Sequence, residues 1–203
     1  MNICCIVGAG DCPEFDFKKN DGDLIIAADG GFRHLLDYGI KPDVAIGDFD
    51  SLGYIPDDIE IIKLPAEKDV TDMVAAVETG IKKGYKTFYI YGGCGGRIDH
   101  TISNLQLSAS VAEKGLKVFI RDGKTVITAI HNESLVFDST YKGYISVFSH
   151  SDISNGVTIK GLKYLLENAE LSCTNPLGVS NEFIGEEAEI TVENGTLIIV
   201  YSH

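Results

Sequence analysis

The sequence predicts an α/β N-terminal domain with a mostly parallel, Rossmann-like sheet, followed by an all-β, sandwich-like C-terminal domain. Apolar, strand-like runs alternate with helix-like segments over residues 1 to about 120, as in parallel sheets with crossover helices. From Lys117 onward, short β-like runs follow one another with turn signals between them. We therefore place the two domains at residues 1–125 and 130–203.

The composition narrows the functional classes. The chain has 203 residues, of which 44% are apolar, and its net charge is −13. This charge argues against a general binder of nucleic acid or of an anionic membrane, since both need a basic surface. The five cysteines contain no Cys-x-x-Cys pair, which predicts reduced thiols in a cytoplasmic protein. The opening apolar run, Ile3 to Val7, is too short for a signal peptide or a membrane span.

The first two predicted strands each end on glycines. Residues 2–8 run into Gly8-Ala9-Gly10, but Pro13 stands where a dinucleotide fingerprint requires a third glycine, so that interpretation fails. Residues 24–28 end on Asp29-Gly30-Gly31, before a helix expected over Phe32 to Tyr38. The backbone at Gly30 and Gly31 could approach a phosphate closely. A tight turn in which Asp29 caps the helix is an equal alternative.

The next predicted strand, Val44 to Ile46, ends on Gly47 and is followed by two acids. In an extended backbone Asp48 and Asp50 point to the same side. A polar turn stabilised by Asp side chains is the alternative.

A further strand is expected over Ile59 to Leu64, before a helix that runs to about Lys83. Asp69 fits its N-cap and Asp72 its first turn. Asp72 could instead project past the helix end toward a cation.

The strand Thr87 to Tyr91 leads into a loop with four glycines in five residues, Gly92 to Gly96. So much glycine costs backbone entropy, which favours a loop that wraps a ligand. Arg97 then offers a planar fork for phosphate oxygens. In the following helix, expected to reach about Lys114, His100 and Asn104 share one face. A cap or surface role for His100 is the alternative.

Ligands of parallel sheets bind at the carboxyl ends of the strands, so we expect Asp29, Asp48, Asp50 and the loop 92–99 to gather there.

The β-like runs of the second domain are 118–121, 125–130, 134–137, 144–149, 157–160, 188–192 and 196–201. Its turn signals are Asp122-Gly123, His131-Asn132, Asn155-Gly156 and Asn194-Gly195.

Several motifs, in this order, resemble those of the thiamine pyrophosphokinase family. They are Asp-Gly-Gly at 29–31, Gly-Asp-Phe-Asp-Ser at 47–51, Lys-Asp-x-Thr-Asp at 68–72 and Gly-Gly-Arg-x-Asp-His at 95–100. Gly-Leu-Lys-Tyr at 161–164 and Ser-Asn-Glu at 180–182 resemble that family's thiamine-binding domain. The resemblance covers nearly the whole chain.

The resemblance implies transfer of a pyrophosphoryl group from ATP to the hydroxyethyl oxygen of thiamine, giving thiamine diphosphate and AMP, with Mg²⁺. It also implies a homodimer, with thiamine between the catalytic domain of one chain and the β-domain of the other. The implied catalytic residues are Asp48, Asp50, Asp72 and Arg97, and the three acids among them hold the metal. Asp50 or Asp72 could accept the hydroxyl proton, and the sequence does not choose between them.

The remaining candidate residues divide between the two substrates. Those expected to bind ATP and its phosphates are Asp29, Gly30, Gly31, Lys68, Gly95, Gly96, Arg97, His100 and Asn104. Asp99, Ser180 and Asn181 are expected on the thiamine side. Because the chain contains no Trp, Tyr164 or Phe183 would supply any aromatic surface for the cationic thiazolium.

Two alternatives remain. A pyrophosphokinase acting on a hydroxymethyl pterin would share the acidic core, but the motifs at 161–164 and 180–182 argue against it. A non-catalytic sensor of Mg²⁺-bound nucleotide would not need a second domain to hold an alcohol acceptor.

Overall fold

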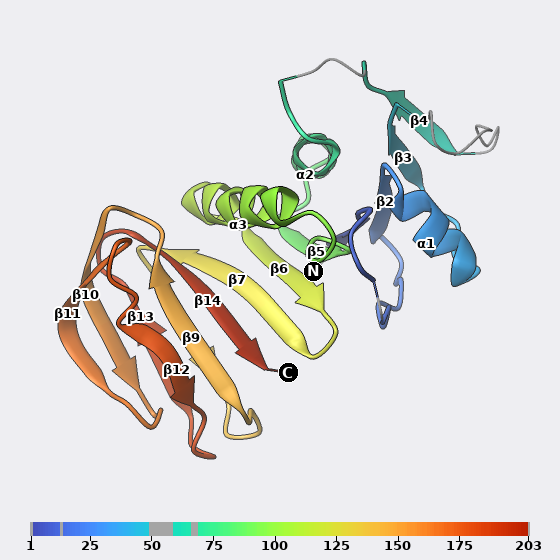
Figure 1. Ribbon diagram of the computed structural model, residues 1–203. Helices are drawn as coiled ribbons and strands as arrows, with labels where there is room; N and C mark the ends of the chain where they lie inside the picture. Colours follow the sequence, from blue (N-terminus) through green and yellow to red (C-terminus); the bar gives the residue numbers. More distant parts are fainter. Residues whose placement is uncertain (1, 13, 49–58, 66–68, 203) are drawn as a thin grey trace. The chain divides into compact units, whose positions relative to one another are not determined.

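The computed structural model describes residues 2–12, 14–48, 59–65 and 69–202, and the chain divides into two compact units (Figure 1). Unit 1 comprises Met1–Asn104 and Ile120–Gly123, and unit 2 comprises Leu105–Phe119 and Lys124–His203. Helix α3 (Ile98–Glu113) and strand β6 (Lys117–Asp122) contribute residues to both. Within the described ranges, no helix is long and apolar enough to cross a membrane.

Unit 1 is built on parallel strands in the order β5-β1-β2-β3-β4. Their bounds are β1 Ile3–Val7, β2 Leu24–Ala28, β3 Val44–Gly47, β4 Glu60–Lys63 and β5 Thr87–Tyr91. The predicted mostly parallel sheet is therefore confirmed. The strand expected over residues 59–64 is shorter at both ends, because only Glu60–Lys63 pair with β3.

Helices cover both faces of this sheet. Helix α1 (Gly31–Asp37) contributes to an apolar cluster that includes Cys5 of β1. Gly80 of α2 (Asp72–Lys82) lies so close to the sheet that a Cβ there would be 2.9 Å from Cys4 Sγ. Since neighbouring residues of a strand point to opposite faces, α1 and α2 pack on opposite sides.

The starts of both helices differ from the sequence prediction. Thr71, not Asp69, caps α2: the backbone N–H of Val74 donates to Thr71 Oγ1 at 3.2 Å. The position of Asp72 in the first turn is confirmed. Helix α1 begins one residue earlier than expected, after Gly30, with no side-chain cap, so the capping role considered for Asp29 is wrong.

The strands of unit 2 are antiparallel. Two runs are hydrogen-bonded side by side, β12-β9-β14-β7 and β11-β10-β13-β8, and residues of both share one apolar cluster. The bounds are β7 Thr125–His131, β8 Ser134–Phe137, β9 Tyr144–Ser149, β10 Ile153–Lys160, β11 Leu166–Ser172, β12 Gly178–Glu182, β13 Ala188–Thr191 and β14 Thr196–Ser202. The predicted all-β composition of this region is confirmed for residues 125–202.

Two strands and one irregularity were not anticipated. Strands β11 and β12 are rich in polar residues and each has a single buried residue, so they lack the apolar alternation that reveals a strand. Asn155-Gly156, expected as a turn, lies inside β10, where the register with β11 shifts between Ser154 and Val157. Such a shift marks a β-bulge, which uses the same residue types as a turn.

Asp23 anchors the start of β1. It is 8% exposed, and its carboxylate accepts hydrogen bonds from the backbone N–H groups of Ile3 at 2.7 Å and Asn20 at 2.9 Å. Burial by itself raises the pKa of this carboxyl, but the hydrogen bonds lower that pKa below its ordinary value of 3.8. The ionised side chain therefore stabilises the folded state.

Replacing Asp23 with Ala is expected to lower the free energy of unfolding by about 2 kcal/mol, because two backbone donors lose a charged acceptor. Urea denaturation measures this change, with Asp21→Ala, at an exposed acid, as the control. Because the folded-state pKa of Asp23 is lowered, its contribution is complete above pH 3.8 and is lost as the pH falls through the folded-state value. Equal effects of the two substitutions at neutral pH contradict the anchoring role.

Candidate active site

The carboxyl-end edge of the unit 1 sheet holds a pocket of about 310 Å³, which we call the strand-end pocket. Its lining comes from four chain segments and from the start of α3: Gly8–Asp11, Ala28–Asp29, Thr71–Met73, Gly92–Arg97, His100 and Asn104. All of these residues belong to unit 1.

The structure brings three predicted acidic segments together at this pocket. The backbone N–H of Asp29 donates to the carbonyl of Ile46 at 2.8 Å, which ties the end of β2 to the end of β3. A Cβ on Gly47 would lie 3.3 Å from Asp29 Cα and 3.8 Å from Asp72 Oδ1. The start of α2 therefore faces the strand end that leads into Asp48. Asp50 and Lys68 lie outside the described residues.

Asp29 has a backbone conformation that side chains rarely adopt. Its φ is 50°, in the left-handed region, where a residue with a Cβ costs about 1 kcal/mol or more. The conformation is held by the bond to Ile46 and by the N–H of Phe32, which donates to the Asp29 carbonyl at 3.3 Å. The chain thus turns sharply from β2 into α1, and Asp29 stays at the pocket wall.

The glycine-rich loop after β5 runs beside the loop after β1. The N–H of Gly10 donates to the carbonyl of Gly92 at 2.9 Å, and that of Asp11 to the carbonyl of Cys94 at 3.0 Å. At Gly95, where φ is 78°, a Cβ would collide with the carboxylate of Asp11. At Gly92 a Cβ would collide with the carbonyl oxygen of Gly8, so part of the glycine content serves the close packing of these two loops, in addition to any ligand.

Residues 8–11 belong to the pocket, although sequence reasoning set them aside with the failed dinucleotide fingerprint. The position of β1, between β2 and β5, accounts for their presence, because the loop after an inner strand emerges between its neighbours. His34 of α1, another residue that sequence reasoning missed, supports this loop through a hydrogen bond of 2.9 Å between its Nε2 and the Gly10 carbonyl.

Arg97 and Asp99 form a two-point ion pair at the pocket mouth. Arg97 Nη2 is 2.5 Å from Asp99 Oδ2, and Nε is 3.2 Å from Oδ1. The side chains are 72% and 61% exposed. The hydrogen bonds from Arg97 lower the pKa of Asp99. Because exposed ion pairs contribute little stability, exchanging Asp99 for a phosphate as the partner of Arg97 costs little.

His100 and Asn104 both line the pocket from α3. Asn104 is only 6% exposed, and its Nδ2 donates to the Gly93 carbonyl at 2.7 Å. This bond connects α3 to the middle of the glycine-rich loop. His100 is exposed.

No group of three metal-ligating side chains occurs within the described ranges. Asp50, one of the three acids predicted to hold a metal, lies outside those ranges. The donors at the strand ends are carboxylate oxygens, and Asp72 lies within reach of the segment that carries Asp48. This chemistry fits a hard divalent cation, which prefers oxygen ligands.

In unit 2, the predicted thiamine residues form a connected group. Asn181, which is 4% exposed, accepts from the N–H of Tyr164 at 2.9 Å and donates to the Tyr164 carbonyl at 2.7 Å. Ser180 has a φ of 61°, and its N–H donates to Ser146 Oγ at 3.0 Å. The Tyr164 ring is exposed, whereas Phe183 packs against the rings of Phe137 and Tyr141. Tyr164 is therefore the better placed of the two aromatic candidates.

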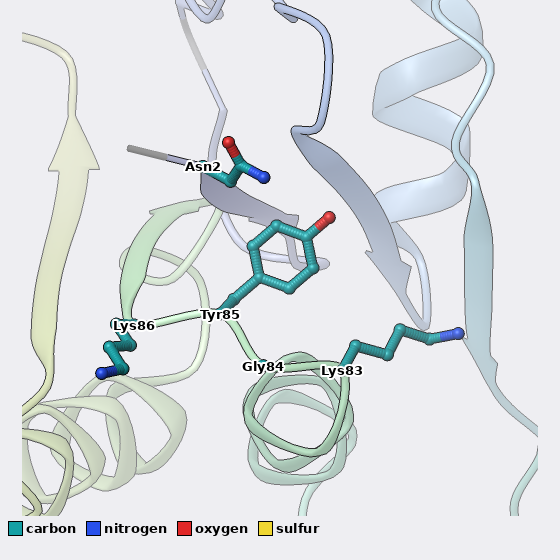
Figure 2. Close-up of a pocket in the computed structure, with 5 residues that line it drawn as sticks. All are labelled: Asn2, Lys83, Gly84, Tyr85 and Lys86. Carbon is teal, nitrogen blue, oxygen red and sulfur yellow. The ribbon is translucent and has the colours of Figure 1, made fainter.

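A second hollow of about 330 Å³ lies between the start of β1 and the start of β5, lined by Asn2, Lys83, Gly84, Tyr85 and Lys86. Figure 2 shows the side chains of Lys83 and Lys86 pointing away from each other. Lys83 pairs with Glu60 at 2.7 Å, and the Tyr85 hydroxyl donates to the Gly22 carbonyl at 2.8 Å. The hollow therefore presents no converging charge.

Comparison with known proteins assigns both halves of the chain. Residues 17–120 match the family model described as thiamin pyrophosphokinase, catalytic domain. Residues 127–197 match the model described as thiamin pyrophosphokinase, vitamin B1 binding domain.

Individual relatives agree with these matches. The thiamine pyrophosphokinase of Bacillus subtilis is 31% identical over 198 residues, covering 94% of this chain and 92% of the relative. The crystal structure of the Bacillus subtilis enzyme superposes with a TM-score of 0.87 at 29% identity, covering 98% of each chain. That of the Geobacillus thermodenitrificans thiamin pyrophosphokinase has a TM-score of 0.85 at 29% identity, covering 99% of this chain and 97% of the other.

The packing of the two loops predicts that substitution by Ala destabilises the protein to different extents at two neighbouring glycines. Gly95 and Gly96 both have positive φ, but only a Cβ at Gly95 meets other atoms. We expect Gly95→Ala to lower the free energy of unfolding by about 1–3 kcal/mol more than Gly96→Ala, since a close steric conflict adds to the backbone strain. Denaturant unfolding of both variants measures the difference. In a double-mutant cycle, Asp11→Gly is expected to remove it, and a difference that persists contradicts the proposed packing.

Proposed function

This chain belongs to the thiamin pyrophosphokinase family, and we propose that it carries out that family's reaction in the strand-end pocket. The family's general function is ATP-dependent pyrophosphoryl transfer to thiamine, a step of thiamine diphosphate biosynthesis. One observation above all supports the proposed location. Asp29, Asp72 and the strand end before Asp48 converge beside a glycine-rich loop.

The acids suit a divalent metal, which the family generally uses together with ATP. We propose Mg²⁺, held by the carboxylates of Asp48, Asp50 and Asp72. Carboxylates at these positions would hold such an ion, which would supply the positive charge that phosphate oxygens need. The carboxylates alone would repel a triphosphate, so the acidic residues and the cation are needed together.

The groups proposed to bind ATP and its phosphates are Asp29, Gly30, Gly31, Lys68, Gly95, Gly96, Arg97, His100 and Asn104. Backbone N–H groups of glycines approach phosphate oxygens without a side chain in the way. Arg97 adds a planar, two-point donor once it exchanges Asp99 for phosphate. Together these donors hold the triphosphate while the alcohol approaches.

In the proposed reaction, the hydroxyethyl oxygen of thiamine forms a bond to the β-phosphorus of ATP. The bond between that phosphorus and the oxygen of the α-phosphate breaks, and AMP leaves. The hydroxyl proton passes to a carboxylate, for which Asp50 and Asp72 are the candidates. Alignment of the three reacting atoms and stabilisation of the spreading charge provide the catalysis.

For thiamine we propose Asp99, Tyr164, Ser180 and Asn181. The hydrogen bonds of Asn181 are made to the backbone of Tyr164, so Asn181 acts by fixing the segment that presents the tyrosine ring. The exposed ring is a suitable surface for the thiazolium cation. We further propose a homodimer in which residues of both chains complete this site. The match of residues 127–197 to a vitamin B1 binding domain favours thiamine over a pterin as acceptor.

Several finer assignments belong to the same proposal. We describe the N-terminal domain as Rossmann-like over residues 1–125 and the C-terminal domain as sandwich-like over residues 130–203. We also propose a cytoplasmic location, which the five free cysteines support.

Incubation with ATP, Mg²⁺ and thiamine tests the function directly. We expect thiamine diphosphate and AMP in equal amounts, measured by chromatography of the products. Replacing thiamine by a hydroxymethyl pterin is the control and should give no product. Formation of ADP, or no turnover, contradicts the proposal.

Asp72 is expected to be essential to the reaction. Asp72→Asn should lower kcat by at least about 100-fold, as loss of a charge-stabilising group in an active site typically does. Glu78→Gln, at an exposed acid further along α2, is the control and should retain kcat within about threefold, since Glu78 does not line the pocket. Thermal unfolding of both variants verifies that they fold. Comparable activity of the two variants would place the metal elsewhere.

A further inference from the structure

Asn104 has an acceptor atom for which the described residues offer no donor. Its Nδ2 is identified by the bond of 2.7 Å to the Gly93 carbonyl, because a carbonyl accepts and only the nitrogen of the amide donates. Within the described ranges, Oδ1 has no hydrogen-bond partner. Every fully buried side-chain oxygen or nitrogen in those ranges has a partner, so Oδ1 is not fully buried. Asn104 is 6% exposed and lines the strand-end pocket. Oδ1 therefore reaches the interior of that pocket.

Once a ligand fills the pocket and displaces water, an amide oxygen in this position requires a hydrogen-bond donor from that ligand. The triphosphate of ATP carries acceptor oxygens only, so it cannot satisfy Oδ1. The donors of ATP are the 2′- and 3′-hydroxyl groups of the ribose and the amino group of the adenine. A buried acceptor that meets such a group discriminates strongly against analogues without it, because it is then left unpaired.

The other acceptors of the pocket support the same assignment. The carboxylates of Asp11 and Asp29 also line it, and Asp11 lies directly against Gly95. Acceptor groups suit hydroxyl and amino groups, whereas the phosphates need the backbone donors and Arg97. We propose that Asn104 is a specificity residue for ATP: its Nδ2 fixes the glycine-rich loop, and its Oδ1 accepts a hydrogen bond from the nucleoside. This inference rests on the proposed function.

The first test compares ATP with analogues that each lack one donor. These are 2′-deoxy-ATP, 3′-deoxy-ATP and purine riboside triphosphate, which lacks the amino group. For one of them, the wild-type protein should show kcat/KM about tenfold or more below the value for ATP. The analogue that fails identifies whether ribose or base supplies the donor. Equal kcat/KM values for ATP and all three analogues overturn the proposal, independently of the results for the substituted proteins.

The second test uses two substitutions at the same position. Asn104→Ala removes both hydrogen-bonding functions and should reduce the discrimination against that analogue to about onefold. Asn104→Asp keeps an acceptor but loses the donor to Gly93, so it should raise KM for every nucleotide while the discrimination remains. Ser108→Ala, at a buried polar residue one turn further along α3, is the control and should leave the discrimination unchanged.

The ratio of two nucleotides is measured on the same protein, so a general loss of stability cancels from it. Discrimination that persists in Asn104→Ala, or a change confined to KM for thiamine, overturns the proposal. Calorimetric titration of the nucleotides in the absence of thiamine separates this inference from the proposed function. Selective ATP binding that depends on Asn104, without formation of thiamine diphosphate, supports the inference and contradicts only the reaction.

Discussion

Parallel pairing of the strands in unit 1 determines where its acidic and glycine-rich segments lie. Strands β1, β2, β3 and β5 run in one direction, so the segments that follow Val7, Ala28, Gly47 and Tyr91 all emerge at the same edge. The Thr71 cap starts α2 at that edge as well, which directs Asp72 toward the end of β3. Residues that are far apart in the chain thereby become the walls of one pocket.

Close backbone approach is the second constraint on this pocket. The loop after β1 is hydrogen-bonded to the loop after β5, and a side chain at Gly95 would displace Asp11. Asp29 is held in the left-handed region by its bond to Ile46. These conformations cost free energy locally, and the parallel sheet on which they stand stabilises them. A rigid pocket wall results, which suits a reaction that depends on the alignment of reacting atoms.

The electrostatics of the pocket reconcile an acidic chain with an anionic substrate. A net charge of −13 opposes ATP in general, and the donors proposed to bind it are concentrated in the glycine-rich loop and Arg97. The ion pair between Arg97 and Asp99 is exposed, so the guanidinium can change partners at little cost. Asn104 contributes to both the loop and the pocket, because its Nδ2 donates to the Gly93 carbonyl and its Oδ1 faces the pocket.

The sequence alone determined the elements with strong local patterns and the family to which the chain belongs. Strand β2 is apolar throughout, and it was predicted with the correct bounds because every residue faces protein. The ordered motifs were sufficient for the family, since each places chemically specific residues at fixed spacing. Strands β11 and β12 could not be found in this way, because an exposed, polar strand is defined by its partners.

Only the tertiary structure decided which groups meet. It added Gly8–Asp11 to the pocket, replaced Asp69 by Thr71 as the cap of α2, and showed that Asn181 bonds to the backbone of Tyr164. It also left one atom of Asn104 facing the pocket. The physical reason is common to all of these cases. Hydrogen-bond partners and steric conflicts depend on distances between atoms, and residues distant in sequence acquire those distances only when the sheet and its loops are assembled.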